Sequence, residues 1–288
     1  MAIRSVFVSK TTYPFFEEIL ITFHHFPGFA LSQKRKCQIG LHQNFLAKYP
    51  EQKVQEISSA SLMSLGSKLS AMNLKKRTKQ GITSVESAFQ SSRIYSNGTV
   101  SVGPFPEYLF LPGKECKKLV KQASKDMHSY QYEFDGMIFY APDYHISLFY
   151  DYLYLNALME PENEEISTQL LEEGYLAFSD LATKSLNCQS RSAAIYVGLV
   201  KAGLIDRVQD YGTYLELFRT TKDRTAASPK AYENVQLLYR NRVQLLSPIV
   251  PCTFDKEAVE LYYTEHCNML TNKKEKDNYL DLSSSHSG

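Results

Sequence analysis

Tryptophan is absent from the 288 residues, and cysteine, glycine and proline are sparse, with 5, 13 and 11 copies. So few glycines and prolines exclude a low-complexity or collagen-like chain. The cysteines are odd in number and widely spaced, without the paired spacings of a zinc site, so we expect free thiols and no metal. No window holds eighteen consecutive apolar residues, and residues 1–10 are too short and mixed for a signal peptide. We therefore expect a cytoplasmic protein with no membrane contact.

The chain also has little net charge, +1, but this value conceals an asymmetry. Residues 1–130 hold 18 Lys or Arg against 8 Asp or Glu, whereas residues 131–288 hold 14 against 23. A basic front half suits a polyanionic ligand such as nucleic acid or a dinucleotide, and it is equally compatible with an ordinary solvated surface. Hydrophobic residues make up 43% of the chain, with 20 Tyr and 16 Phe, which indicates a globular, aromatic-rich protein.

Apolar periodicity predicts a mainly α fold with a small N-terminal β-sheet, an α+β class. The expected strands cover residues 6–8 and 19–26, with a hairpin within 132–140. The expected helices cover residues 31–49, 58–69, 84–95, 114–125, 146–159, 166–178, 188–202, 211–218 and 231–246. We expect a main domain over 1–204, a helical extension packed on it over 205–270 and a disordered tail over 271–288.

The first candidate cluster lies on the helix predicted over 84–95. Glu86, Phe89, Gln90 and Arg93 share one face at helical spacing, so a carboxylate, an amide and a guanidinium can line a pocket. The alternative is structural, because Thr83-Ser84-Val85-Glu86 also fits a capping box.

The second cluster precedes the most apolar predicted helix. Asp180 can act as an acid or base there, and Asn187 and Arg191 can hold a polar or phosphorylated ligand. The alternative is ordinary N-capping, with Arg191 on the surface.

The third cluster follows the Pro27-Gly28 turn. Ser32, Gln33, Lys34 and Lys36 stand at a probable helix start, which is a reasonable phosphate cradle. The alternative is a solvated helix face.

Four ordered segments together resemble the NADAR antitoxins encoded beside DarT-type DNA ADP-ribosylating toxins. They are PGFALSQKRKCQIGLH (27–42), EISSASLMSLGSKLSAMNL (56–74), VESAFQSSRIY (85–95) and YLAFSDLATKSLNCQSRSAAIYVGL (175–199). The superfamily's helical Glu motif resembles residues 85–90 here, and its later acidic residue and Asn resemble Asp180 and Asn187.

The resemblance implies a compact, mainly helical domain that hydrolyses the N-glycosidic bond between ADP-ribose and guanine in single-stranded DNA, with no cofactor. It also implies the cognate DarT-type toxin as a partner. Glu86, Asp180 and Lys34 are then the catalytic candidates. The substrate-binding candidates are Ser32, Gln33, Lys36, Asn73, Phe89, Gln90, Asn187 and Arg191.

Two chemical routes stay open for such a reaction. Glu86 and Asp180 can divide the roles of activating water and protonating the leaving nitrogen, if burial raises the pKa of one of them. Alternatively Lys34 attacks the ribose C1 and forms a Schiff base. Three other functions also remain: an antitoxin that acts by toxin contact alone, an N-glycosidase of a small phosphorylated metabolite, and DNA binding without catalysis.

Overall fold

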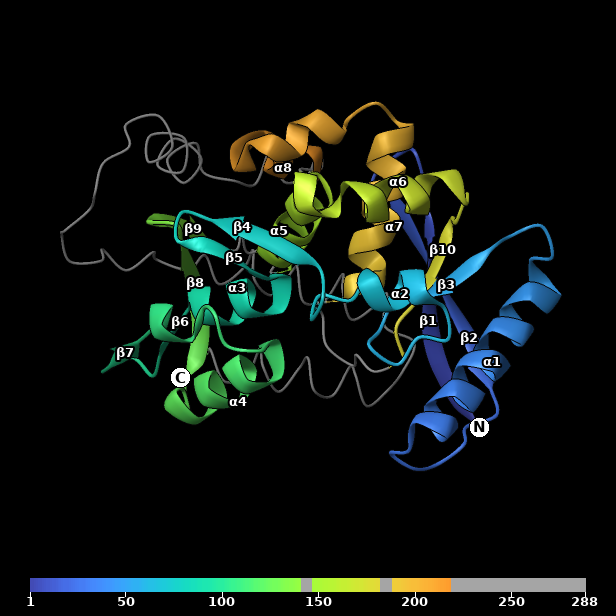
Figure 1. Cartoon of the computed structure of the whole chain (residues 1–288), viewed down its shortest axis with the longest axis horizontal. Helices are drawn as coiled ribbons and strands as arrows, with labels where there is room; N and C mark the ends of the chain where they lie inside the picture. The colour runs from blue at the N-terminus through green and yellow to red at the C-terminus, as the bar shows by residue number, and fades with distance from the viewer. Residues whose placement is uncertain (141–146, 182–187, 219–288) are drawn as a thin grey trace, which may run out of the picture. The chain divides into compact units, whose positions relative to one another are not determined.

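The computed structural model describes residues 1–140, 147–181 and 188–218. It has the predicted α+β class, with helices, a four-stranded N-terminal sheet, a two-stranded hairpin and a second four-stranded sheet (Figure 1). None of the helices in this part of the chain is both long enough and apolar enough to cross a membrane. The cysteines within it, Cys37, Cys116 and Cys188, are buried free thiols.

The N-terminal sheet joins segments that are far apart in sequence. Its order is β2 (Phe16–Phe23), β1 (Ala2–Ser9), β10 (Ala177–Ser179) and β3 (Val54–Glu56). All neighbours are antiparallel except β10 and β3, which run parallel with Ser179 opposite Glu56. The carboxyl ends of β3 and β10 therefore lie side by side, and the side chains that follow both strands meet there.

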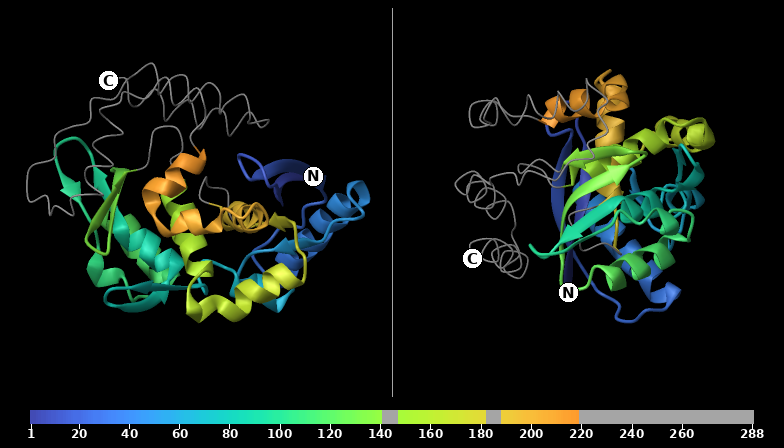
Figure 2. Two further views of the ribbon diagram at one scale, coloured as in Figure 1. Left: turned by 90° about the horizontal axis from the view of Figure 1, so that it is seen from above. Right: turned by 90° about the vertical axis from the view of Figure 1, so that its left-hand side faces the viewer.

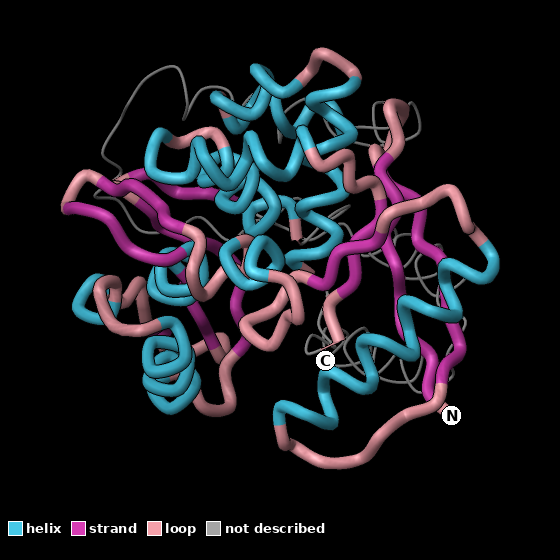
Figure 3. Tube along the Cα trace, turned by 45° about the vertical axis from the view of Figure 1, so that its right-hand side comes forward, coloured by secondary structure: helices cyan, strands magenta, loops and turns pink. Residues whose placement is uncertain are grey.

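Helix α1 (Leu31–Lys48) lies along this sheet (Figure 3). Its buried stripe is Cys37, Leu41 and Phe45, at spacings of four residues, packed on Val6 and Ile21 of the sheet. Leu31 and Ile39 of the same helix lie outside this stripe, and both side chains are exposed. Helix α7 (Gln189–Lys201), which contacts β1, β2 and β10, is buried over nearly its whole length.

The second sheet has the order β7 (Ser101–Val102), β6 (Arg93–Ser96), β8 (His128–Phe134) and β9 (Met137–Tyr140). Strands β8 and β9 form the predicted hairpin. Helix α3 (Val85–Ser92) is followed immediately by strand β6 of this sheet, and it contacts α4 (Gly113–Ala123). The short helix η1 (Pro106–Tyr108) lies between β7 and α4 in the chain.

Three predicted helices are shorter than expected. Helix α3 ends at Ser92 because the following Arg93–Ser96 segment pairs with β8. Helix α6 (Glu164–Glu172) ends because Gly174, just beyond it, adopts a left-handed conformation with φ of +69°. Helix α2 covers only Ser64–Lys68, since serine side chains upstream bind backbone amides: Ser58 Oγ accepts from Ala60 N and Ser61 Oγ from Met63 N.

An aromatic cluster joins α3, the second sheet and the C-terminal helices. Helix α5 (Leu148–Leu158) supplies Phe149, whose ring stacks on Tyr132 with centroids 4.4 Å apart. Helices η3 (Ile205–Gln209) and α8 (Tyr211–Phe218) follow α7, and α8 lies beside α5 (Figure 2). Tyr211 meets Phe139 and Phe149 edge-on. The rest of the predicted 205–270 segment, including the helix expected over 231–246, lies outside the described residues, as does the 271–288 tail.

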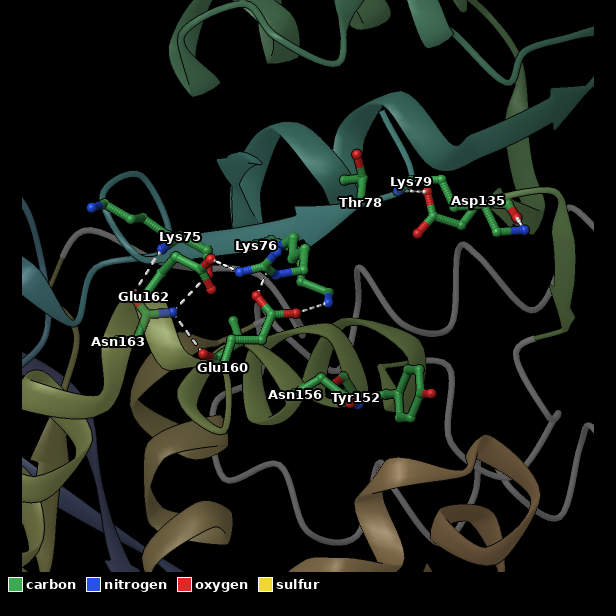
Figure 4. A network of polar contacts seen from close by, with 12 residues as sticks. Lys75, Lys76, Thr78, Lys79, Asp135, Tyr152, Asn156, Glu160, Glu162 and Asn163 are labelled. Atoms are coloured by element: carbon green, nitrogen blue, oxygen red, sulfur yellow. Dashed lines mark hydrogen bonds and ion pairs between the residues drawn. The ribbon is translucent and has the colours of Figure 1, made fainter. Parts of the chain in front are cut away.

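A polar network fixes the hairpin of β4 (Lys75–Thr78) and β5 (Gly81–Ser84) to the end of α5 (Figure 4). The Asn163 side chain, from η2 (Pro161–Asn163), accepts from Lys75 N and donates to the carbonyls of Lys75 and Ala157. Lys76 forms an ion pair with Glu160. This hairpin leads directly into α3, so the network helps to position the first residues of that helix.

Candidate active site

Glu86 is buried near the N-terminus of α3, with 6% of its surface exposed. Its Oε1 accepts a hydrogen bond from Gln90 Nε2 at 3.0 Å and lies 3.4 Å from Lys117 Nζ of α4. Helix α4 begins at Gly113, where a Cβ would come within 3.1 Å of Glu86 Cγ, so glycine allows this close approach. The predicted pairing of Glu86 and Gln90 on one face is confirmed by their contact.

The capping-box interpretation of Glu86 is wrong. The N-cap of α3 is Ser84, whose hydroxyl accepts from Ser87 N at 3.1 Å, and the Thr83 hydroxyl donates to Leu109 O instead. The Glu86 carboxylate is therefore free of a capping role and faces Gln90 and Lys117.

Asp180 directly follows β10 and is also buried. Its Oδ2 accepts from Gln189 Nε2 at 2.9 Å. Capping of α7 by Asp180 does not occur: the N-cap residue is Cys188, with no side-chain cap hydrogen bond.

A short chain of hydrogen bonds connects Asp180 with Glu86. Gln189, which donates to Asp180, also accepts at Oε1 from Ala71 N at 2.8 Å. The carbonyl of Ala71 in turn accepts from Glu86 N at 2.9 Å. One glutamine side chain and the backbone of one residue, Ala71, thus hold the two carboxylate-bearing segments together. Gln189 was missed from sequence because an amide at a helix start gives no signal of the partner it will meet.

A second carboxylate, Glu56, accompanies Asp180 at the end of the N-terminal sheet. Burial and the neighbouring Asp180 charge raise the pKa of Glu56 to about 7. Its carboxylate accepts from the Ser179 hydroxyl at 2.5 Å and from Leu181 N at 3.0 Å. Glu56 was not predicted from the sequence, because β3 is the short segment Val-Gln-Glu, whose single apolar residue gives no strand signal.

His42 of α1 extends this network. Its Nε2 lies 2.9 Å from Ser179 Oγ, and burial lowers the pKa of His42 to about 4. Because Ser179 donates its proton to Glu56, it can only accept from His42, so Nε2 of the neutral ring carries the hydrogen. These hydrogen bonds from His42 through Ser179 to Glu56 link α1 to the carboxylate pair of Glu56 and Asp180.

Glu56 and His42 should give folding stability opposite dependences on pH. The folded-state pKa of Glu56, about 7, exceeds its ordinary value of 4.5. The contribution of Glu56 to the free energy of unfolding is therefore full below about pH 4.5, and it falls by about 3 kcal/mol as the pH rises to about 7. The pKa of His42 is depressed from 6.5 to about 4, so its contribution grows as pH rises between those values. Relative to wild type, the free energy of unfolding of Glu56→Gln should rise with pH between about 4.5 and 6.5, and that of His42→Gln should fall. Urea unfolding at several pH values measures both slopes, and parallel curves for the three proteins would contradict the assignment.

Tyr150 of α5 lies near both catalytic candidates. Burial raises the pKa of Tyr150 well above its ordinary value, and the charges of Glu86 and Asp180 both add to the shift. Its ring meets Phe89 edge-on, with centroids 5.1 Å apart. Phe89 itself is almost fully buried in the aromatic cluster, so the structure places this predicted substrate-binding residue behind the site rather than on its surface.

Arg191 lies in the core of the protein. Its guanidinium contacts both carboxylate oxygens of Asp151, at 3.1 and 3.2 Å, and Asp151 also accepts from the Ser192 hydroxyl. The expectation of a surface Arg191 is wrong, because only 8% of the residue is exposed. The buried charge is neutralised within the fold, which makes it a structural residue.

The remaining candidates among the described residues do not contact Glu86. Ser32, Lys34 and Lys36 are exposed and Gln33 is partly exposed on the first turns of α1, whose N-cap is Ala30. Lys36 Nζ lies 5.8 Å from the centre of the Phe26 ring. Asn73 is exposed and its amide donates to Ser67 O. Asn187 lies outside the described residues. Within residues 1–140, 147–181 and 188–218, no three His, Cys, Asp or Glu side chains are grouped as metal ligands.

Comparison with known proteins gives one family. A model of the DarT1-associated NADAR antitoxins matches residues 2–228, which include every described element from β1 to α8. No curated protein matches the chain. The match confirms the resemblance carried by the four sequence segments and indicates an antitoxin role. The chain therefore belongs to the DarT1-associated NADAR antitoxin family.

Proposed function

We propose that this antitoxin hydrolyses the N-glycosidic bond between ADP-ribose and guanine in DNA, and so reverses the modification made by a DarT-type toxin. The observation that carries the proposal is the pair of buried carboxylates, Glu86 and Asp180, whose segments are connected by hydrogen bonds from Asp180 through Gln189 and the Ala71 backbone to the amide nitrogen of Glu86. Buried carboxylates with differently tuned surroundings are the usual means of glycosidic cleavage.

In the proposed reaction Glu86 acts as the base, and the Asp180–Glu56 pair acts as the acid. The C1–N bond breaks, its electron pair stays on the guanine nitrogen, and positive charge develops at the ribose C1. Glu86 stabilises that charge and accepts the proton of the water that attacks C1. The Asp180–Glu56 pair supplies the proton to the leaving nitrogen, since the raised pKa of Glu56 lets the pair hold one proton near neutral pH.

The test of this function is incubation with single-stranded DNA that carries ADP-ribosylated guanine, followed by detection of free ADP-ribose. Release of ADP-ribose with an intact guanine base in the product supports the proposal. A folded protein that leaves the modified DNA unchanged would overturn it.

The lysine route makes a separate prediction. If Lys34 attacks C1, the ribose opens and borohydride should trap a covalent enzyme–ADP-ribose adduct, which Lys34→Ala should abolish. The exposed position of Lys34 on α1, away from any described contact with Glu86, favours the carboxylate route, for which no adduct is expected. Mass spectrometry of the reduced mixture distinguishes the two, and an adduct that persists in Lys34→Ala would assign the chemistry to another lysine.

A second candidate function is neutralisation by contact with the toxin. Helix α6 supports it, because Glu164, Glu165 and Glu172 line one open depression and form an acidic surface that can imitate DNA. A contact antitoxin would still neutralise its toxin when Glu86 is replaced, whereas a hydrolase would not.

A further inference from the structure

Helix α4 carries an exposed row of positive charge. Its lysines recur at spacings of three and four residues, so they share one helical face. They are Lys114, Lys117, Lys118, Lys121 and Lys125, the last just past the helix end. The helix also contacts α3, which bears Glu86 and Gln90 (Figure 1).

A cavity of about 390 Å³ lies between this lysine row and the start of β6. Gln90, Arg93 and Tyr95 line one wall, and Lys117, Lys121 and Lys125 line the other. Asp126 also lines it, so four cationic side chains face the cavity against one carboxylate.

Two residues that line the cavity, Gln90 and Lys117, contact the catalytic candidate Glu86. Gln90 is hydrogen-bonded to Glu86, and Lys117 Nζ lies 3.4 Å from the Glu86 carboxylate. A ligand that fills the cavity therefore extends from Glu86 along α4 towards Lys125.

Apart from Lys117, which pairs with Glu86, the cations of the cavity have no carboxylate partner within the described residues. Arg93 lies over the Tyr95 ring, 4.7 Å from its centre, and over Phe89 at 5.5 Å, which orients its guanidinium without a carboxylate. Within the described part of the chain, Arg93, Lys121 and Lys125 form no ion pair. Like charges one helical turn apart repel each other, so this arrangement favours an anionic ligand with repeated charges.

We infer that this α4 groove binds the phosphodiester backbone of single-stranded DNA beside the modified guanine. The inference deepens the proposed function and rests on it for the identity of the nucleic acid. Four residues of helix rise about 6 Å, which is comparable with the spacing of neighbouring phosphates in an unstacked strand. Lys121 and Lys125 are thus placed to contact successive phosphates, while Lys117 keeps its ion pair with Glu86.

The test compares two charge-matched double variants. Lys121→Glu with Lys125→Glu alters the groove, and Lys48→Glu with Lys201→Glu makes the same change of net charge on exposed positions of α1 and α7. The probe is fluorescein-labelled, unmodified single-stranded DNA of about ten nucleotides, a length within the usual site size, and binding is measured by anisotropy at several salt concentrations.

The groove variant should bind the DNA at least about tenfold more weakly, and its slope of log affinity against log salt should be shallower by about 1.4, which corresponds to two lost phosphate contacts. The control variant at Lys48 and Lys201 should stay near wild type in both, and Lys121→Arg with Lys125→Arg should retain binding. No wild-type binding, equal losses in both charge-reversed variants, or no loss in the groove variant would each overturn the inference. Loss of toxin binding with unchanged DNA binding would also overturn it, in favour of an acidic protein.

The proposed function is tested separately, by measuring the release of ADP-ribose from modified DNA by the wild-type protein. If no ADP-ribose is released but DNA binding depends on Lys121 and Lys125, the hydrolase proposal fails and the groove stands. If release by the groove variant is unchanged at limiting substrate, the groove fails and the hydrolase stands.

Discussion

Glu86→Gln is expected to lower the rate of ADP-ribose release at least about tenfold, because an amide can neither accept the proton of the attacking water nor neutralise the charge at C1. The substitution keeps the size of the side chain, and a glutamine oxygen can still accept from Gln90. We therefore expect the free energy of unfolding to change by about 1 kcal/mol or less. The measurement is single-turnover release of ADP-ribose from modified DNA, with urea unfolding of the same protein.

Glu115→Gln is the matched control for this variant. Glu115 is an exposed carboxylate in the first turn of α4, close in sequence to Lys117, and its replacement makes the same change of net charge. Its activity should stay near wild type. A folded Glu86→Gln protein with wild-type turnover would exclude Glu86 from the chemistry, and a loss of stability alone would return it to a structural role.

The largest effect on stability is expected at Arg191. Arg191→Met should lower the free energy of unfolding by about 3–5 kcal/mol, because it leaves the fully buried Asp151 carboxylate without its counter-charge. Burial already raises the pKa of Asp151, and Arg191 opposes that shift. Without Arg191 the pKa should rise further, so the loss of stability should become smaller as the pH falls and Asp151 takes up a proton.

The double variant Arg191→Met with Asp151→Asn tests the cause. It removes the unpaired charge, so it should recover part of the stability lost in Arg191→Met, and urea unfolding of all four proteins completes the double-mutant cycle. The phosphate-binding role expected from the sequence makes the opposite prediction: weaker DNA binding with unchanged stability. That result would overturn the structural assignment of Arg191.

Local pattern predicted most of the secondary structure. Helices α1, α4, α5 and α7 lie within a residue or two of their expected limits, because apolar residues at helical spacing and nearby turn residues mark them. Two of the three failures occur where a predicted helix includes residues that pair as a strand. Residues 93–96 and 177–179 carry apolar side chains compatible with either state, and only pairing with β8 or β1 decides for a strand.

The sequence by itself determined the α+β class, the N-terminal strands, the shared face of Glu86 and Gln90, and the family, since each depends on local spacing or on ordered motif segments. Tertiary structure alone decided which polar residues meet. The parallel pairing of β10 with β3 places Glu56 beside Asp180, Gln189 joins Asp180 to the backbone before α3, and Asp151 of α5 meets Arg191 of α7. Apart from Gln189 and Asp180, which are 9 positions apart, these contacts join residues separated by 40 to more than 100 positions in the chain. Their partners and pKa shifts depend on burial and distance, which no local pattern encodes.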